Sequence, residues 1–338
     1  MAQLPAGTRV AGVDCGTNSI RLLISEVEES STGTSLTEIT RSNTIVRLGQ
    51  GVDETGELHP DAIARTRDAL ANYVAVMEAE GVSAVRMVAT SATRDAANKD
   101  AFFDMTRELL GRIQPGACAE VITGEEEARL SFLGATIDAP ADAKGPFCVV
   151  DLGGGSTEFI VGTRDGDILG AYSTRMGCVR LTERIMVTDP PTAMEIAQAR
   201  AYVVSQIEEA LVHVPLSGAE VLVGCAGTFT TISALTLGLD SYDPERIHMS
   251  KLDFDDVRTT TRTLTAESAA TRAANPVMHP GRADVIGSGA VVVEEVLAAA
   301  ERVAGINQLI VSEKDILDGI VAGLVSGLNS GLGPSRPQ

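Results

Sequence analysis

Two carboxylates flank a glycine-rich turn in the segment VVDLGGGSTEFIVG, residues 149–162. Asp151 ends one apolar strand and Glu158 begins the next. Glycine lets backbone N–H groups approach a phosphate closely, and two carboxylates beside such a cradle suit Mg²⁺, which takes oxygen ligands and keeps water molecules. The predicted metal ligands are Asp151 and Glu158, and the predicted phosphate donors are Gly153, Gly154, Gly155 and Ser156. A glycine-rich hairpin with solvated acids is the alternative for this segment taken alone.

A second segment, GVDCGTNSIRLLIS, has the same layout near the start of the chain. When the two segments are aligned, Asp14, Gly16 and Ser19 fall on the aspartate, the first glycine and the serine of the later copy. This recurrence predicts an internal duplication of a whole domain. Arg21 falls where Glu158 stands, so it would meet phosphate with a cation, unless it is an ordinary surface residue of the strand. The candidate phosphate ligands here are Thr17, Asn18, Ser19 and Arg21, with Asp14 as a further candidate metal ligand.

A third loop that suits phosphate follows the buried strand predicted in AEVLVGCAGT, residues 219–228. Gly224 and Gly227 lie at the end of that strand, and Thr228 is expected to open a helix. Because the N-terminus of a helix favours anions, Gly227 and Thr228 are predicted to bind phosphate.

Strands and helices alternate through the rest of the chain. Helical patterns cover 60–80, 99–111, 190–214 (opened by proline), 265–303 with a break at 275–281, and 313–324. Strands are expected at 83–90, 118–123, 167–174 and 307–312. Such alternation predicts an α/β fold with a mostly parallel sheet that is covered on both faces.

Composition limits the class of protein. Hydrophobic residues make up 44% of the 338 residues, and the formal charge of −19 makes the surface a poor binder of nucleic acid or anionic lipid. No stretch approaches the roughly 20 apolar residues of a membrane span, and the N-terminus has no secretory signal. The five cysteines show no CxxC spacing and the four histidines no ligand spacing. We therefore expect reduced core thiols and a cytoplasmic protein that binds neither DNA nor membrane.

Three consecutive glutamates occur in TGEEEARL, residues 123–130. Thr123 and Glu126 have the spacing of a capping box, and Glu125 would lie in the first turn, where the helix dipole favours acids. Glu127 is the glutamate that helix formation leaves unexplained. It could be solvated, or form an ion pair with Arg129 or Arg94.

The chain resembles the exopolyphosphatase/guanosine pentaphosphate phosphohydrolase family, which belongs to the larger group of actin-like, sugar-kinase-like and Hsp70-like ATPase folds. The motifs that carry the resemblance run in the family's order over residues 10–289: VDCGTNSIRLLI, ATSATRDAAN, VITGEEEARLSFLG, VVDLGGGSTEFIVG, MGCVRLTER, GCAGTFTT and GRADVIGSG. TGEEEARL and MGCVRLTE are the most specific of these. One departure is SEKDILDGIV, which has Leu317 and Asp318 where the family often has an arginine before the glycine of the last helix.

The resemblance implies two RNase H-like domains flanking a cleft, in the short two-domain form. Domain I would comprise 1–129 with about 313–330, domain II 130–312, and 331–338 a flexible tail. It implies Glu127 as the general base and Arg94 as a phosphate ligand. The alternative for Arg94 is that it caps a helix or pairs with Asp95. A homodimer is expected from the family only. Further arginines could line a groove for a longer phosphate chain or form ordinary surface ion pairs: Arg175, Arg180, Arg184 and Arg282.

These features predict an exopolyphosphatase. Glu127 would deprotonate a water for in-line attack on the terminal phosphate of inorganic polyphosphate, with Mg²⁺ or another divalent cation as cofactor and K⁺ as a further candidate. Guanosine pentaphosphate (pppGpp) is the alternative substrate. A sugar-kinase-like or actin-like ATPase and a non-catalytic sensor of phosphate polyanions are more distant alternatives.

Overall fold

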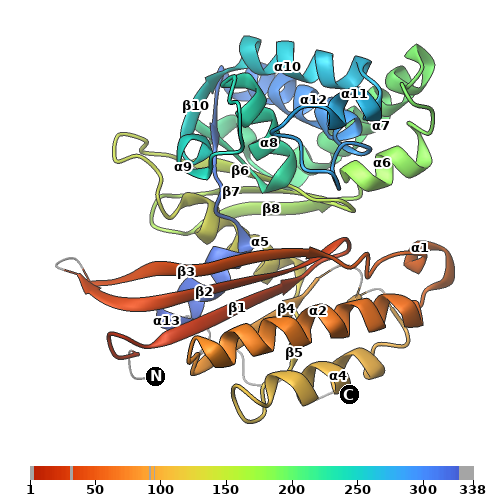
Figure 1. Cartoon of the computed structure of the whole chain (residues 1–338). Helices are drawn as coiled ribbons and strands as arrows, with labels where there is room; N and C mark the ends of the chain where they lie inside the picture. The colour runs from red at the N-terminus through yellow and green to blue at the C-terminus, as the bar shows by residue number, and fades with distance from the viewer. Residues whose placement is uncertain (1–3, 31–32, 91–92, 95, 327–338) are drawn as a thin grey trace. The chain divides into compact units, whose positions relative to one another are not determined.

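The computed structural model describes residues 4–30, 33–90, 93–94 and 96–326. These residues divide into two compact units (Figure 1). Unit 1 takes its residues from Met1–Leu130 and Ile316–Gln338, and unit 2 is Ser131–Asp315. The tail expected at 331–338 lies outside the described residues.

Unit 1 is built on a mixed sheet with the strand order β3-β2-β1-β4-β5. The first three strands form an antiparallel meander, and β4 and β5 continue the sheet in parallel. Its elements are β1 (Arg9–Cys15), β2 (Ser19–Ser30), β3 (Gly33–Ile45), α1 (Val52–Thr55), α2 (Pro60–Ala79), β4 (Ala84–Ala89), α4 (Asp100–Leu110), β5 (Ala119–Val121), the start of α5 (Gly124–Thr136), and α13 (Ile316–Ser326).

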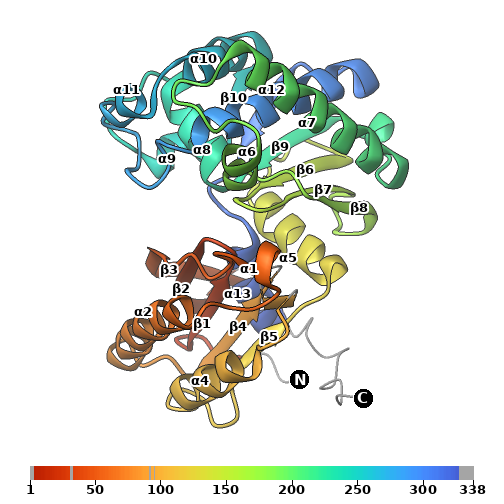
Figure 2. The same cartoon turned by 90° about the vertical axis from the view of Figure 1, so that its right-hand side faces the viewer.

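Helices cover both faces of this sheet (Figures 1 and 2). Ala11 and Val13 of β1 pack in one apolar cluster with residues of α2 and α4, and Val10 packs in another with residues of α13. This is the two-residue period of a strand buried on both sides. Gly12 lets α13 approach, because a Cβ there would lie 2.8 Å from a methyl carbon of Val321.

Unit 2 has the strand order β10-β11-β9-β6-β7-β8. Its elements are the end of α5, then β6 (Phe147–Leu152), β7 (Thr157–Gly162), β8 (Ile168–Thr174), α6 (Cys178–Arg184), α7 (Ala193–His213), the 3₁₀ turn η1 (Leu216–Gly218), β9 (Val221–Cys225), α8 (Ala226–Thr236), α9 (Pro244–Ile247), β10 (Ser250–Asp253), α10 (Phe254–Ala266), α11 (Ala269–Ala273), α12 (Ile286–Ala304) and β11 (Gln308–Val311).

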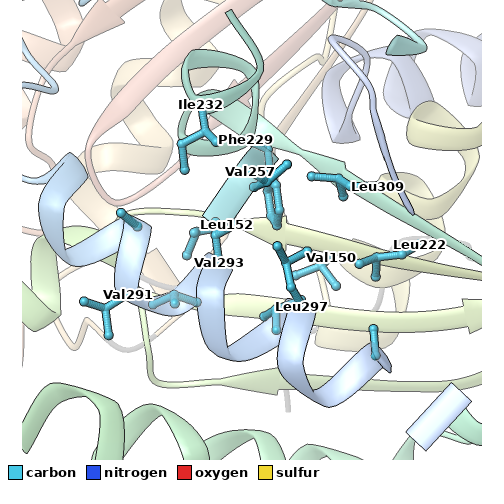
Figure 3. Packing of buried hydrophobic residues seen from close by; sticks show 14 of the residues in the cluster. Val150, Leu152, Leu222, Phe229, Ile232, Val257, Val291, Val293, Leu297 and Leu309 are labelled. Atoms are coloured by element: carbon cyan, nitrogen blue, oxygen red, sulfur yellow. The ribbon is translucent and has the colours of Figure 1, made fainter. Parts of the chain in front are cut away.

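The core of unit 2 lies between its sheet and the helices that pack on it. Val150 and Leu152 of β6 meet Phe229 of α8 and Val293 and Leu297 of α12 in one cluster (Figure 3). Alternate residues of β6 enter this cluster, so Asp151, which lies between Val150 and Leu152, is on the opposite face of the sheet.

The two sheets share one topology, which confirms the predicted duplication. The series β8-β7-β6-β9-β11 matches β3-β2-β1-β4-β5 in order and in the direction of every pairing, and β10 is an addition. The prediction of mostly parallel sheets is wrong, because each repeat opens with a three-stranded meander, and tight turns can join only antiparallel neighbours.

Several predicted helices begin elsewhere. Thr192, not a proline, caps α7, in a capping box with Glu195. The stretch expected as 265–303 contains three helices, of which α10 already starts at Phe254. The last helix begins at Ile316 rather than at residue 313, because Glu313 and Lys314 still bond to residues of unit 2.

Candidate active site

The glycine turn of unit 2 joins two strands in a register that places Asp151 directly opposite Glu158. Gly153 N–H closes the turn on the carbonyl of Ser156 at 3.0 Å. Opposed residues on neighbouring strands have Cβ atoms about 5 Å apart. Asp151 is half-buried and the side chain of Glu158 is buried, so the two predicted metal ligands form one carboxylate pair at the mouth of the turn.

The start of α6 holds this turn from one side. N–H groups of Cys178, Val179 and Arg180 donate to the carbonyls of Gly153 and Gly154 at 3.0–3.1 Å. Arg180 also donates from Nε to the carbonyl of Gly155 at 2.9 Å. Residue 177 must be glycine, because a Cβ there would overlap the backbone of the turn.

Although the carbonyl groups of the turn accept hydrogen bonds, several of its N–H groups donate none to the described residues. Within the described part of the chain, the N–H groups of Gly154, Gly155 and Ser156 and the hydroxyl of Ser156 have no hydrogen-bond acceptor. Unclaimed N–H groups at a turn are what an anion binds. Of the four residues predicted as phosphate donors, Gly154, Gly155 and Ser156 thus keep N–H groups that a phosphate could bind, whereas the N–H of Gly153 is already bonded to the carbonyl of Ser156.

Unit 1 repeats this arrangement. Gly16 N–H donates to the carbonyl of Ser19 at 2.9 Å, and Asp14 lies directly opposite Arg21. The carbonyls of Thr17 and Asn18 accept from N–H groups in the segment 46–49, which follows β3 as α6 follows β8. The clamp on the turn is thus part of the repeat, although the two clamping segments share no sequence motif.

The main difference between the repeats is the residue opposite the aspartate. Arg21 donates from Nε and Nη2 to Oδ2 of Asp14, at 3.0 and 2.7 Å. A guanidinium thus neutralises Asp14 where unit 2 has a second carboxylate. Arg21 is half-buried and ion-paired rather than an ordinary surface residue.

Glu127 lies in the first turn of α5, and its carboxylate pairs with Arg94 across 2.5 Å between Oε2 and Nη2. Burial raises the pKa of Glu127, the hydrogen bond and charge of Arg94 lower it, and the charge of Asp14 raises it, with a net upward shift. The ion pair with Arg94 that was an alternative to catalysis is therefore present. The ion pair uses Nη2 of Arg94. The buried Nε–H of the same guanidinium has no partner among the described residues, so Arg94 still has a donor for an anion. Asp95, its other predicted partner, lies outside the described residues.

Glu125 and Glu126, the other two glutamates of the motif, lie in the first turn of α5, but the predicted capping box is incomplete. Glu126 N–H donates to Oγ1 of Thr123 at 3.2 Å, but the carboxylate of Glu126 binds Arg86. The capping box is thus only half formed, because a buried arginine competes for the carboxylate. Glu125 is exposed in the first turn.

The third predicted loop has a packing explanation. A Cβ on Gly224 would overlap Phe229, and one on Gly227 would overlap the guanidinium of Arg282. The helix starts at Ala226, so Gly227 and Thr228 lie inside its first turn rather than before it. Phosphate binding at Gly227 and Thr228 stays a prediction.

The remaining arginines have different roles. Arg180 supports the glycine turn, and Arg282 lies against the start of α8, donating to Oγ1 of Thr231 at 3.0 Å. Asp318, at the departure from the family pattern, is buried and binds Arg41 at 2.6 Å. Arg175 and Arg184 stay candidates for a groove.

Sequence reasoning missed two serines. Ser131 donates to Oδ2 of Asp151 at 3.2 Å, and Ser173 donates to Oε1 of Glu158 at 2.7 Å. Ser173 stands opposite Glu158 in the β7–β8 register, so a correct prediction of that hairpin could have found it. Ser131 carried no signal, since it is one small residue within a helix.

The described residues contain no group of three or more His, Cys, Asp or Glu side chains that could hold a metal ion, so a cation at Asp151 and Glu158 would need water or substrate as further ligands. Among the same residues, no helix is long and apolar enough to cross a membrane. All five cysteines are free thiols, and four of them are buried.

Comparisons with known proteins agree with the geometry. The model of the Ppx/GppA phosphatase family matches residues 23–323. Exopolyphosphatase 2 of Mycobacterium tuberculosis is 52% identical over 313 residues, which cover 93% of this chain and 97% of that protein. A guanosine-5'-triphosphate,3'-diphosphate pyrophosphatase of Photobacterium profundum is 32% identical, over 75% of this chain and 48% of that protein.

Among solved structures, an exopolyphosphatase-like protein superposes with a TM-score of 0.86 at 39% identity, covering 95% of this chain and 99% of the other. This similarity and the repeated sheet topology confirm the expected fold, two α/β domains of the RNase H-like, actin-like ATPase type. Since the family model spans most of the sequence, and both turns keep the geometry that its motifs predict, the chain belongs to the Ppx/GppA phosphatase family.

Proposed function

We propose that this protein is an exopolyphosphatase, which hydrolyses the terminal phosphoanhydride bond of inorganic polyphosphate and releases orthophosphate. The observation that carries the proposal is the turn of unit 2, where unclaimed N–H groups adjoin the Asp151–Glu158 pair. The name of the relative from Mycobacterium tuberculosis supports the choice of substrate.

The residues of unit 2 would bind the phosphate. Gly154, Gly155 and Ser156 would donate N–H groups to its oxygens, because α6 already holds the carbonyls of the turn. Two carboxylates directly opposite each other repel, and one of this pair is buried. A hard divalent cation bound between them would remove this repulsion, and carboxylate oxygens are suitable ligands for it. A cation bound there would neutralise the charge of the phosphate oxygens.

We assign the proton transfer to Glu127, the general base that the family motif implies. Arg94 would turn from Glu127 to a phosphate oxygen and so release the carboxylate. Glu127 would then accept a proton from the water as its oxygen attacks the terminal phosphorus. The bond from that phosphorus to the bridging oxygen breaks in line, so the products are orthophosphate and a chain one phosphate shorter.

The overall charge disfavours a polyanionic substrate, so local cations have to compensate. At −19 the protein repels polyphosphate at long range. Arg21 and Arg94 in unit 1, and Arg180 and Arg282 in unit 2, are the arginines at the predicted phosphate loops. We expect substrate affinity to fall as the chain is shortened, because fewer phosphates then reach these groups.

The experiment compares orthophosphate release from long polyphosphate, short polyphosphate and pppGpp at equal concentrations of chain ends. Faster release from polyphosphate supports the proposal, and much faster release from pppGpp would replace it with the alternative hydrolase. Tight ATP binding with phosphorylation of an acceptor would instead favour a kinase. A homodimer, a cytoplasmic location, and Mg²⁺ or K⁺ as the particular ions stay predictions from the sequence.

A further inference from the structure

Three polar residues form a row across the strands of unit 2. Asp151 on β6 stands opposite Glu158 on β7, and Glu158 stands opposite Ser173 on β8. Ser173 donates its hydroxyl to Oε1 of Glu158 at 2.7 Å. Side chains of opposed residues point to the same face of a sheet. The serine therefore holds one end of the carboxylate pair.

The other end is held from a helix. Ser131 lies on α5 with only 1% of its surface exposed, and it donates its hydroxyl to Oδ2 of Asp151 at 3.2 Å. Each member of the carboxylate pair thus accepts a hydrogen bond from a different serine. In the repeat in unit 1, the guanidinium of Arg21 holds Asp14 instead, so the paired serines belong to the unit whose turn has two acids.

We propose that Ser131 and Ser173 are positioning residues for a divalent cation, which hold the carboxylates of Asp151 and Glu158 in the orientation that binds it. This inference rests on the proposed function. Two neighbouring carboxylates repel each other and would otherwise rotate apart. A hydroxyl that donates to one carboxylate oxygen limits the rotation of that carboxylate.

A purely structural role is the competing explanation, since any buried hydroxyl with a partner contributes to stability. The two explanations differ in what a substitution changes. Loss of a structural hydrogen bond lowers the stability of the fold without changing cation affinity. Loss of a positioning hydrogen bond weakens the cation even where the fold is intact.

The test measures Mn²⁺ binding to the substrate-free protein by electron paramagnetic resonance, and Mg²⁺ binding by competition. We expect Ser131→Ala and Ser173→Ala each to weaken Mn²⁺ binding by about 10-fold or more. Thr174→Val is the matched control. Its buried hydroxyl lies one residue from Ser173 but donates to the backbone carbonyl of Thr157, so cation affinity should stay within twofold of wild type.

Two further variants guard against general damage to the fold. Ser173→Thr keeps the hydroxyl and should restore Mn²⁺ affinity. In an Asp151→Asn background, Ser131→Ala should have no further effect on the residual affinity, because its partner is already changed. Thermal melts of the metal-free variants check that each is folded.

Mn²⁺ affinities within twofold of wild type in folded Ser131→Ala and Ser173→Ala would overturn the inference, and so would an equal loss in Thr174→Val. Failure of the inference is separable from failure of the proposed function. Wild-type protein that releases no orthophosphate contradicts the function. Wild-type activity with unaltered Mn²⁺ binding in the serine variants contradicts only the role of the serines.

Discussion

Arg94 donates a hydrogen bond from Nη2 to Oε2 of Glu127 at 2.5 Å. The predicted phosphate ligand and the predicted general base thus neutralise each other in an ion pair. Such a pair stabilises both groups in a site that burial makes costly for charge. An incoming phosphate would compete for the arginine and free the carboxylate for the attacking water.

Replacing the base should abolish turnover and spare binding. Glu127→Gln keeps the shape of the side chain but cannot accept the proton, so kcat should fall by about 10²- to 10⁴-fold, with the KM for polyphosphate within a few-fold. Steady-state orthophosphate release measures both. Glu125→Gln, an exposed neighbour in the same turn, is the control and should behave as wild type. Unchanged kcat in Glu127→Gln would remove the assignment of the base.

The pH dependence of activity should reflect the raised pKa of Glu127. Burial raises this pKa by more than Arg94 lowers it. The acidic limb of kcat/KM should therefore lie above the usual glutamate value of about 4.3. In Arg94→Ala the lowering influence is gone, and the limb should move to higher pH, on top of a loss of kcat/KM. Rate profiles between pH 4 and 9 test this. A limb that stays in place or moves to lower pH would contradict it.

Asp138 should stabilise unit 2 only above acidic pH. A hydrogen bond from His248 and the neighbouring Lys314 hold the pKa of Asp138 below its ordinary range. A depressed pKa in the folded state contributes stability above the unfolded value of about 3.9 and loses it as the pH falls further. Asp138 is partly exposed, so Asp138→Asn should cost about 1 kcal/mol or less at pH 7.

Thermal melts between pH 2.5 and 7 should show the difference between wild type and Asp138→Asn shrinking as the pH falls below about 4. Asp142→Asn serves as the control, because Asp142 is mostly exposed and its contact with Lys251 is 3.5 Å. A difference that grows toward low pH would contradict the assignment.

Two residues with the same φ should respond in opposite directions when alanine and glycine are exchanged. Ala226, at the start of α8, and Gly305, after α12, both have a φ of 67°. A side chain in this left-handed region costs about 1 kcal/mol. Ala226→Gly should therefore raise the melting temperature and Gly305→Ala should lower it, each by a few degrees. A lower melting temperature for Ala226→Gly would show that contacts of its methyl group outweigh the strain.

The two turns and their repetition follow from local sequence alone. An aspartate, a glycine turn and a second apolar strand are local features, so the hairpin and the facing of Asp151 by Glu158 follow from strand geometry within one short segment. The motifs likewise selected Glu127 and Arg94 as candidates, and the structure shows that the two form an ion pair, while their roles stay predictions. The start of α5 directly after Thr123 could be predicted for the same reason, because capping depends on residues within one turn.

Tertiary structure decided what depends on residues far apart in the chain. The clamp of α6 on the glycine turn, the pairing of Arg94 with Glu127, and the hydrogen bond from Ser131 to Asp151 each join segments that only the packed fold brings together. The mixed sheet itself depended on whether a third strand returns beside the second, which local pattern does not specify. Phosphate binding at Gly227 stays a prediction from the sequence, and only the fold shows that the missing Cβ of Gly227 makes room for Arg282, because a glycine pattern indicates that space is needed and not what fills it.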